Sequence, residues 1–147
     1  MEQLACDLFM WDGKDYLVIV DRFSGYIWVH HLQKTATDNV TKGLLETFYL
    51  FGFPLAIQTD NGPQFRGPFK SFCERLGIEH ITSSPYNPSS NGLAEAAVKS
   101  AKSLLQKAKG DPDHSFEETL HAWKNTPRAD GLAPTDLLFG YLSLIHI

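Results

Sequence analysis

The sequence predicts an α/β fold, with a five-stranded mixed sheet and helices on both of its faces. Short apolar, β-branched and aromatic runs separated by turn residues occupy the start of the chain, as in an antiparallel meander. Later apolar runs are short and alternate with segments of helical periodicity, which is typical of strands connected through helices. The 147 residues are 43% hydrophobic and 20% charged, which suits one folded domain with its own core.

The first half of the chain contains four predicted strands and one helix. Residues 4–10, 16–21 and 26–32 form three antiparallel strands, because the intervening stretches WDGKD and RFSG are hairpin signals. A helix follows and ends at Gly52 and Pro54, and Thr37 and Asp38 are its candidate N-terminal caps. Residues 55–59 form a short buried strand that ends at Asp60.

The second half alternates between helix and strand. Residues 69–76 form a helix ended by Gly77, residues 78–81 form a short strand, and SSPYNPSSNG is a loop of turn formers. A long helix runs from Leu93 to about Lys109, and residues 116–125 form another. One narrow face of the long helix is suited to close packing and consists of Ala94, Val98, Ala101, Leu105 and Ala108.

Charge and cysteine usage restrict the function classes. The net charge of −4 argues against a general polyanion-binding protein, yet residues 61–110 carry seven Lys/Arg against three Asp/Glu. A solvated helix face and a phosphate-binding strip explain that segment equally well. Cys6 and Cys73 have no zinc-ligand spacing, so we expect buried free thiols in a reducing compartment. With no signal peptide or membrane span in the sequence, we expect an intracellular protein, nuclear or cytoplasmic, without a membrane partner.

Three acidic residues occupy positions that need an explanation. Asp7 lies inside an apolar strand, where a charge is costly unless it is paired or binds metal. Asp60 ends a strand beside an Asn-Gly turn, and hydrogen bonding within the turn would explain it alone. Glu95 lies in the first turn of a helix, where the helix dipole favours an acid.

Taken together, the three acids indicate metal chemistry. If the first and fourth strands are neighbours, Asp7 and Asp60 lie side by side, and the long helix brings Glu95 opposite them. Mg²⁺ and Mn²⁺ accept such oxygen ligands, and two ions can clamp the attacking and leaving oxygens of a phosphoryl displacement. Lys99 and Lys102 share a helix face with Glu95, so they either pair with it or bind a nucleic-acid backbone.

Longer motifs carry a resemblance to a known family. The stretches resemble, in order, the integrase catalytic core of retroviruses and gypsy-type long-terminal-repeat retrotransposons: DLF, WDGKDYLVIVDRFSGYI, IQTDNGPQF, FCERLGIEHITSSPYNPSSNGLAEAAVKSAKSLL and KNTPRADGLAPTDLLFG. The resemblance covers about residues 5–140. It implies a ribonuclease H-like fold and a DDE polynucleotidyl transferase that processes DNA 3′ ends and joins them to other DNA. In that family the catalytic acids bind two Mg²⁺ or Mn²⁺ ions, and they match Asp7, Asp60 and Glu95.

The same resemblance implies partners and further site residues. The partners are DNA, both element ends and target, and further copies of the chain in a homo-oligomeric full-length protein. Tyr86, Asn91, Lys99 and Lys102 match positions that contact the DNA end in relatives. Asp21 matches none of the three acids, so we expect a turn role for it, and the six histidines form no ligand cluster.

The sequence also departs from the family pattern. Asp60 and Glu95 are 35 positions apart, one fewer than the family spacing, and the shortening lies near FRGPFKSF, where Pro68 restarts the helix. We expect the acids to keep their roles. Within these 147 residues we expect neither a zinc-binding module before the core nor a chromodomain after it. Residues 1–141 are the expected catalytic core domain, and residues 142–147, LSLIHI, leave the family pattern and are expected to be a non-native tail.

Two alternative functions stay open. A ribonuclease H-type nuclease would use the same acids, although TDNGPQF together with PYNPSSNG favours an integrase. A domesticated or degenerate integrase relic would bind DNA or protein without catalysis. The presence of all three acids argues against decay of the site, whereas the missing flanking modules argue for lost biological activity.

Overall fold

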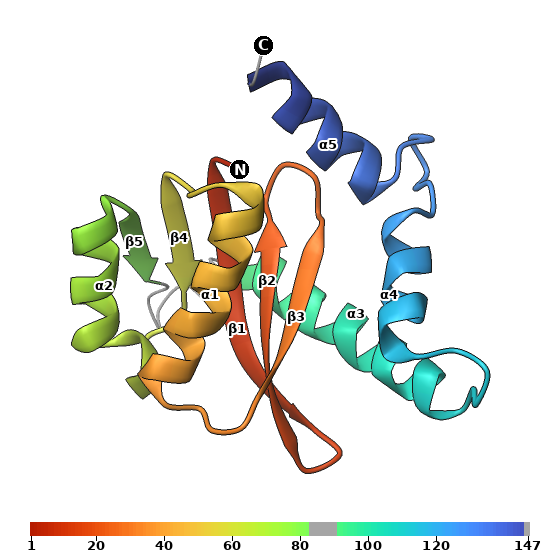
Figure 1. Ribbon diagram of the computed structural model, residues 1–147, viewed down its shortest axis with the longest axis horizontal. Helices are drawn as coiled ribbons and strands as arrows, with labels where there is room; N and C mark the ends of the chain where they lie inside the picture. Colours follow the sequence, from red (N-terminus) through yellow and green to blue (C-terminus); the bar gives the residue numbers. More distant parts are fainter. Residues whose placement is uncertain (83–90, 146–147) are drawn as a thin grey trace.

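Five strands form one mixed sheet in the order β3-β2-β1-β4-β5 (Figure 1). The computed structural model describes residues 1–82 and 91–145. The antiparallel meander consists of β1 (Gln3–Trp11), β2 (Lys14–Asp21) and β3 (Ile27–Leu32). The sheet continues with β4 (Ala56–Thr59), parallel to β1, and β5 (Glu79–Thr82), parallel to β4. The predicted fold class is confirmed, and β1 and β4 are neighbours.

The turn between β1 and β2 explains why the meander begins with a tight hairpin. Asp12 and Gly13 are the two loop residues, and their φ angles are 52° and 72°. Two-residue hairpin loops of this kind favour Asp-Gly, because glycine adopts a positive φ without steric cost. The loop sets the register in which Trp11 pairs with Lys14 and Asp7 pairs with Val18.

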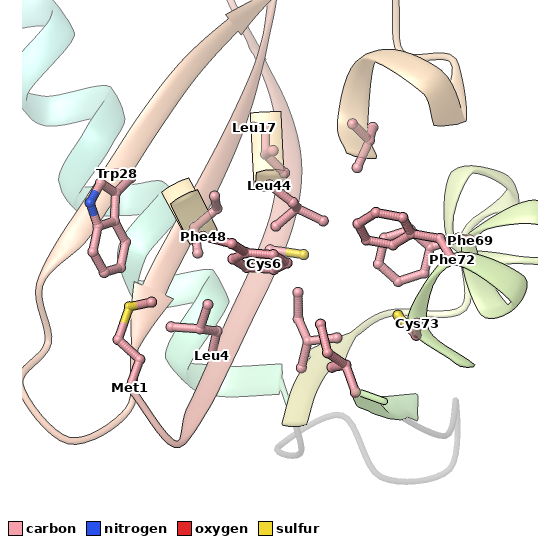
Figure 2. Close-up of a cluster of buried hydrophobic side chains, with 14 of the residues drawn as sticks. Met1, Leu4, Cys6, Leu17, Trp28, Leu44, Phe48, Phe69, Phe72 and Cys73 are labelled. Carbon is pink, nitrogen blue, oxygen red and sulfur yellow. The ribbon is translucent and has the colours of Figure 1, made fainter. Parts of the chain in front are cut away.

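One face of the sheet is covered by α1 (Thr37–Phe51) and α2 (Pro68–Leu76). Their apolar sides pack against alternate residues of the strands, including Leu4 and Cys6 of β1. Figure 2 shows Cys6 in the middle of this cluster and the α2 side chains Phe69, Phe72 and Cys73 at one end of it. Cys6 and Cys73 are both buried free thiols, as predicted, and burial raises the pKa of the Cys6 thiol well above its usual value.

The opposite face is covered by the long helix α3 (Gly92–Lys109). Small side chains line the contact, because Ala94, Ala97 and Ala101 are buried against Ala5, Phe9 and their neighbours on the sheet. The buried side of α3 differs in part from the predicted face. It includes Ala97 and Leu104, which were not predicted, whereas the predicted Val98 and Ala108 are only half-buried. Small residues let the helix approach the strands closely, so its first turn lies near the sheet surface.

Two further helices follow α3 in the described part of the chain. The helix α4 (Phe116–Lys124) packs against α3 through Leu120. The helix α5 (Pro134–Ile145) was not predicted, and it is held by the fully buried Leu138 and by Phe139, whose ring contacts Tyr26 and Phe51. A short 3₁₀ turn, η1 (Pro63–Phe65), was also not predicted. Among the described residues, no helix combines the length and apolar character needed to cross a membrane.

The predicted cap of α1 is wrong. Ala36 occupies the N-cap position, and no side chain caps the helix there. Thr37 begins the helix instead, and its hydroxyl donates to the carbonyl oxygen of Gln64 at 3.2 Å. Because Thr37 is already the first residue of the helix, it does not occupy the N-cap position from which a hydroxyl oxygen accepts a backbone N–H, and its hydroxyl joins α1 to η1 instead.

Candidate active site

Asp7 and Asp60 lie level with each other on neighbouring parallel strands. Ala5 pairs with Gln58 across β1 and β4, so two residues further along Asp7 is level with Asp60, which directly follows β4. Side chains alternate between the two faces of a strand. Since Ala5 and Phe9 face α3, Asp7 faces α3 as well, and so does Asp60, two positions after Gln58. The sequence expectation that these two acids meet is confirmed for the strands that carry them.

The environment of Asp7 disfavours its charged form. The pKa of Asp7 is raised to about 6, mainly by burial, with smaller contributions from the carboxylates of Asp60 and Glu95 and from a side-chain hydrogen bond with Asp60. One opposing contact lowers the pKa, because the backbone N–H of Leu8 donates to Asp7 Oδ1 at 2.8 Å. Two acids that share a proton in this way are typical of carboxylates brought together without a counter-charge.

The position of Asp60 is set by the turn that follows β4. The backbone N–H of Gly62 donates to Asp60 Oδ1 at 2.9 Å, so the side chain closes a turn as well as facing α3. On the other side of Asp60, the hydroxyl of the fully buried Thr59 donates to the Asp60 carbonyl oxygen at 2.7 Å. The turn and the site are therefore compatible roles for one residue.

Glu95 lies in the first turn of α3, the helix that covers the sheet face on which the aspartates lie. Its side chain is exposed, and its charge is close enough to raise the pKa of Asp7. Within residues 1–82 and 91–145, no three acidic, histidine or cysteine side chains lie close enough to hold one metal ion, so Glu95 has to turn toward the aspartates to complete a ligand set. In the same part of the chain Glu95 forms no ion pair with Lys99.

The other predicted residues fall into three groups. Lys99 and Lys102 are exposed on the same side of α3 as Glu95. Asn91 precedes that helix and is only 6% exposed, while Tyr86 lies outside the described residues. The DNA contacts of these four residues stay predictions. Asp21 is a turn residue, as expected: its Oδ2 accepts hydrogen bonds from the backbone N–H and the hydroxyl of Ser24, at 3.0 and 2.7 Å.

The donor set fits a hard divalent cation. Asp7 lies within electrostatic reach of both Asp60 and Glu95, and its raised pKa reflects burial first and then repulsion by these two carboxylates. A divalent cation would offset it and would use oxygen ligands of the preferred kind. Each aspartate also has one oxygen engaged by a backbone N–H, from Leu8 or Gly62, which orients the carboxyl group.

Two residues beside the site were missed by sequence reasoning. Thr59 and His80 are joined by a contact of 2.7 Å between the threonine Oγ1 and the histidine Nε2. Two features of the sequence could have indicated this contact: Thr59 directly precedes the candidate ligand Asp60, and His80 lies in the next predicted strand. These features are a weak signal, because only the parallel pairing of β4 and β5 brings the two residues together.

We expect Asp7→Asn to stabilise the metal-free protein at neutral pH. The pKa of Asp7 is raised from 3.8 to about 6 in the folded protein, which therefore holds this proton more tightly than the unfolded chain does. As a result, the free energy of unfolding falls as pH rises from about 4 to about 6. Asparagine does not ionise. Fully converted, the shift is about 3 kcal/mol, and partial solvent exposure of the carboxyl reduces our expectation to about 1–2 kcal/mol above pH 7. Urea unfolding in chelator at about pH 4 and about pH 8 measures the difference.

The control is Asp113→Asn, which removes one exposed carboxylate far from the site along the chain. The gain in unfolding free energy between the two pH values should be larger for Asp7→Asn than for this variant. If the two gains are equal, the Asp7 carboxyl is not destabilised by its surroundings.

Comparison with known proteins adds sequence relatives. A family model described as "Integrase core domain" matches residues 5–88. The Gag-Pro-Pol polyprotein of Mason-Pfizer monkey virus is 40% identical over 93 residues, which is 63% of this chain. The match spans only 5% of that polyprotein, so the chain corresponds to a small part of its relative.

Solved structures with the same fold include two retroviral cores. The catalytic core domain of BIV integrase superposes with a TM-score of 0.85 at 22% identity, and the match covers 99% of both chains. The HTLV-2 integrase catalytic core domain, in a dimeric form in complex with magnesium, superposes with a TM-score of 0.74 at 25% identity. That match covers 93% of this chain and 95% of the other. The first of these similarities shows the fold alone.

Proposed function

The chain belongs to the integrase core domain family, and from this premise we propose that it forms the catalytic core of an integrase that processes DNA 3′ ends and joins them to target DNA. The observation that carries the proposal is the pair Asp7 and Asp60, level on adjacent parallel strands and facing the helix that bears Glu95. An in-line phosphoryl displacement uses carboxylates placed close together in this way, because they can hold the metal ions that stabilise the attacking and leaving oxygens.

We propose that Asp7, Asp60 and Glu95 hold two Mg²⁺ or Mn²⁺ ions. The magnesium complex of the HTLV-2 core supports the choice of metal. When bound, such ions lower the pKa of an attacking water or DNA 3′-hydroxyl and stabilise the leaving 3′-oxygen. A DDE polynucleotidyl transferase of this kind needs no covalent intermediate with the protein.

The protein's own residues orient the ligands. Leu8 N–H engages Asp7 Oδ1, and Gly62 N–H engages Asp60 Oδ1, so one oxygen of each carboxyl group is held by the backbone. The remaining oxygens are those that serve as ligands. Glu95 completes the set from an exposed position, where a side-chain rotation is enough to bring its carboxylate toward the sheet.

DNA is the proposed substrate, as element end and as target. Lys99 and Lys102 project from the exposed side of α3, one and two turns after Glu95, so they are suited to bind the phosphates that flank the reacting one. Tyr86 and Asn91, from the segment that leads into α3, would position the terminal nucleotides.

Disintegration of a branched DNA tests the proposal. Reversal of strand joining on a preformed branch requires the metal site and modest backbone binding, and it does not require capture of two separate DNA molecules. We expect weak Mn²⁺-dependent resolution of the branch, none in chelator, and no complete integration by this chain alone. Gel analysis of a labelled branched substrate gives the result.

A negative result has two distinct meanings. Folded protein that binds Mg²⁺ or Mn²⁺ but leaves every branched substrate intact would favour a DNA- or protein-binding relic. Folded protein that binds neither metal would contradict the metal site itself. A thermal-shift titration with each metal separates the two outcomes.

Replacing Lys99 and Lys102 together by alanine should weaken DNA binding and reduce its salt dependence. Each phosphate contact that is removed releases about one counterion fewer, so the slope of log K against log salt should fall by about 2 for duplex DNA. Fluorescence anisotropy of a labelled duplex at several salt concentrations measures that slope.

The matched control replaces Lys34 and Lys42 by alanine. Both are exposed, and they lie before and within α1, on the other side of the sheet. This pair removes the same charge and should leave the slope nearly unchanged. Equal slopes for the two double variants would mean that the lysines of α3 do not contact the DNA backbone.

We also propose that the full-length protein works as a homo-oligomer. The dimeric form of the HTLV-2 core supports this assembly for the catalytic domain. Sedimentation velocity tests it: a chain that stays monomeric at every attainable concentration would contradict self-association through this domain.

A further inference from the structure

A chain of three contacts leads to Asp60 and begins at His80, which packs against Phe69 on the face of the sheet covered by α2. His80 on β5 has its Nε2 at 2.7 Å from the Thr59 hydroxyl. That hydroxyl donates to the carbonyl oxygen of Asp60 at 2.7 Å, and Asp60 Oδ1 accepts the N–H of Gly62 at 2.9 Å. The ring of Phe69 packs edge-on against the His80 ring, with centroids 4.9 Å apart.

The proton positions along this chain follow from chemistry. A carbonyl oxygen only accepts hydrogen bonds, so the single hydroxyl proton of Thr59 points at Asp60. Thr59 Oγ1 must then accept from His80, which requires the proton of the imidazole to be on Nε2. The other nitrogen, Nδ1, is buried and has no hydrogen-bond partner among the described residues, in agreement with an unprotonated nitrogen there.

The surroundings of His80 keep its ring neutral. Burial lowers the pKa of His80, and the positive charge of Lys70 lowers it further. A neutral ring with one fixed N–H is a directional donor. A charged ring would have a second N–H, and within residues 1–82 and 91–145 that buried N–H would find no acceptor.

Asp60 needs such support because the strand ladder ends before it. β4 stops at Thr59, whose partner on β5 is Thr82, and the turn begins at once. Two contacts fix the direction of the Asp60 carboxyl group. The N–H of Gly62 donates to the Asp60 side chain, and the hydroxyl of Thr59 donates to the Asp60 carbonyl oxygen. Groups that orient a metal ligand in this way commonly change metal affinity 10–100-fold when they are removed.

We propose that His80 is a positioning residue for Asp60, which it acts on through the hydroxyl of Thr59. The inference rests on the proposed function, because Asp60 is a metal ligand only under that proposal. Nothing in the chain of contacts requires His80 to touch metal or DNA.

Four variants test the inference by Mg²⁺ titration of the intact chain. His80→Leu removes the donor and Thr59→Val removes the hydroxyl at constant shape, and each should weaken Mg²⁺ binding by about tenfold or more. His80→Gln keeps an N–H donor and Thr59→Ser keeps the hydroxyl, so both should stay within about threefold of the parent. The double variant with leucine and valine should bind no more weakly than the weaker single variant, because both changes break one chain.

Nitrogen-15 NMR of the metal-free protein tests the same contacts without any metal. His80 should be a neutral ring with its proton on Nε2, and Thr59→Val should abolish that preference. The backbone amides of Asn61 and Gly62 should shift in His80→Leu and return toward the parent positions in His80→Gln. A purely structural contribution of His80 to packing would lower stability without this recovery.

The outcomes separate the two proposals. A parent chain that binds no Mg²⁺ overturns the metal site, and the NMR result then decides the positioning role alone. A parent that binds Mg²⁺, with His80→Leu and Thr59→Val binding equally tightly, overturns the positioning role and keeps the metal site. A proton on Nδ1, or a charged His80 ring at neutral pH, overturns it as well.

Discussion

Asp60→Asn should abolish the stabilisation that Mg²⁺ gives the parent protein while the fold and the turn persist. Asparagine keeps an Oδ1 that accepts the Gly62 N–H but supplies no negative charge to a cation. At about 100 times its dissociation constant, Mg²⁺ should add about 2.7 kcal/mol to the parent. For a domain of this size that corresponds to about 5–10 °C in melting temperature. Thermal unfolding with and without Mg²⁺ should show this shift for the parent and none for the variant.

Without metal, the same variant should be as stable as the parent or more stable, because one repelling carboxylate beside Asp7 has been removed. Asp113→Asn provides the matched charge change at an exposed position and should keep the full response to Mg²⁺. If Asp60→Asn also keeps that response, Asp60 serves the turn alone and the proposed metal site is wrong.

Glu95→Gln should reduce Mn²⁺-dependent disintegration below detection, a loss of about a thousandfold or more. The estimate follows from the loss of one charged ligand from a site whose metals would activate the nucleophile and stabilise the leaving group, each worth several kcal/mol of barrier. The fold should not change, because the Glu95 side chain is exposed and makes no ion pair within the described residues. Single-turnover assays on branched DNA, together with circular dichroism, measure both quantities.

Glu117→Gln is the matched control for Glu95→Gln. Glu117 is also an exposed acid in the first turn of a helix, so both changes remove the same favourable interaction with a helix dipole, about 0.3–1 kcal/mol. Full activity of Glu117→Gln beside an inactive Glu95→Gln would assign the loss to the site. Similar activity of the two variants would mean that Glu95 only favours the start of α3.

The elements that sequence reasoning predicted correctly are those with local causes. The Asp12–Gly13 turn defines the first hairpin, Pro68 begins α2, and Gly77 ends it in a left-handed conformation. The strands that carry Asp7 and Asp60 were predicted from local patterns of the same kind. That β1 and β4 are neighbours in the sheet was the one assumption about topology. It is the assumption on which the meeting of Asp7 and Asp60 depended.

The elements that were missed depend on tertiary contacts. The helix α5 packs through the buried Leu138 and through Phe139, whose ring contacts Tyr26 and Phe51 far away in the sequence. No local sequence pattern predicts that contact. The predicted cap of α1 was wrong because the helix begins at Thr37 itself, so that Ala36 takes the N-cap position and the Thr37 hydroxyl donates to Gln64. The contact between Thr59 and His80 was invisible because it crosses from one strand to the next.

The strand order also determines when, during folding, the two aspartates first meet. The β1–β2–β3 meander pairs neighbours in sequence, whereas pairing β1 with β4 closes a loop of about fifty residues, which is the slower event. A chain emerging from the ribosome therefore exposes one apolar edge of β1 until β4 has been synthesised, and such an edge is prone to aggregate. In pulse-labelled hydrogen exchange during refolding, the amides of β2 and β3 should become protected before those of β4. Asp7 and Asp60 therefore come together only after β1 has paired with β4, so a metal ion bound by both carboxylates would stabilise this pairing once formed and would not guide the folding of the meander.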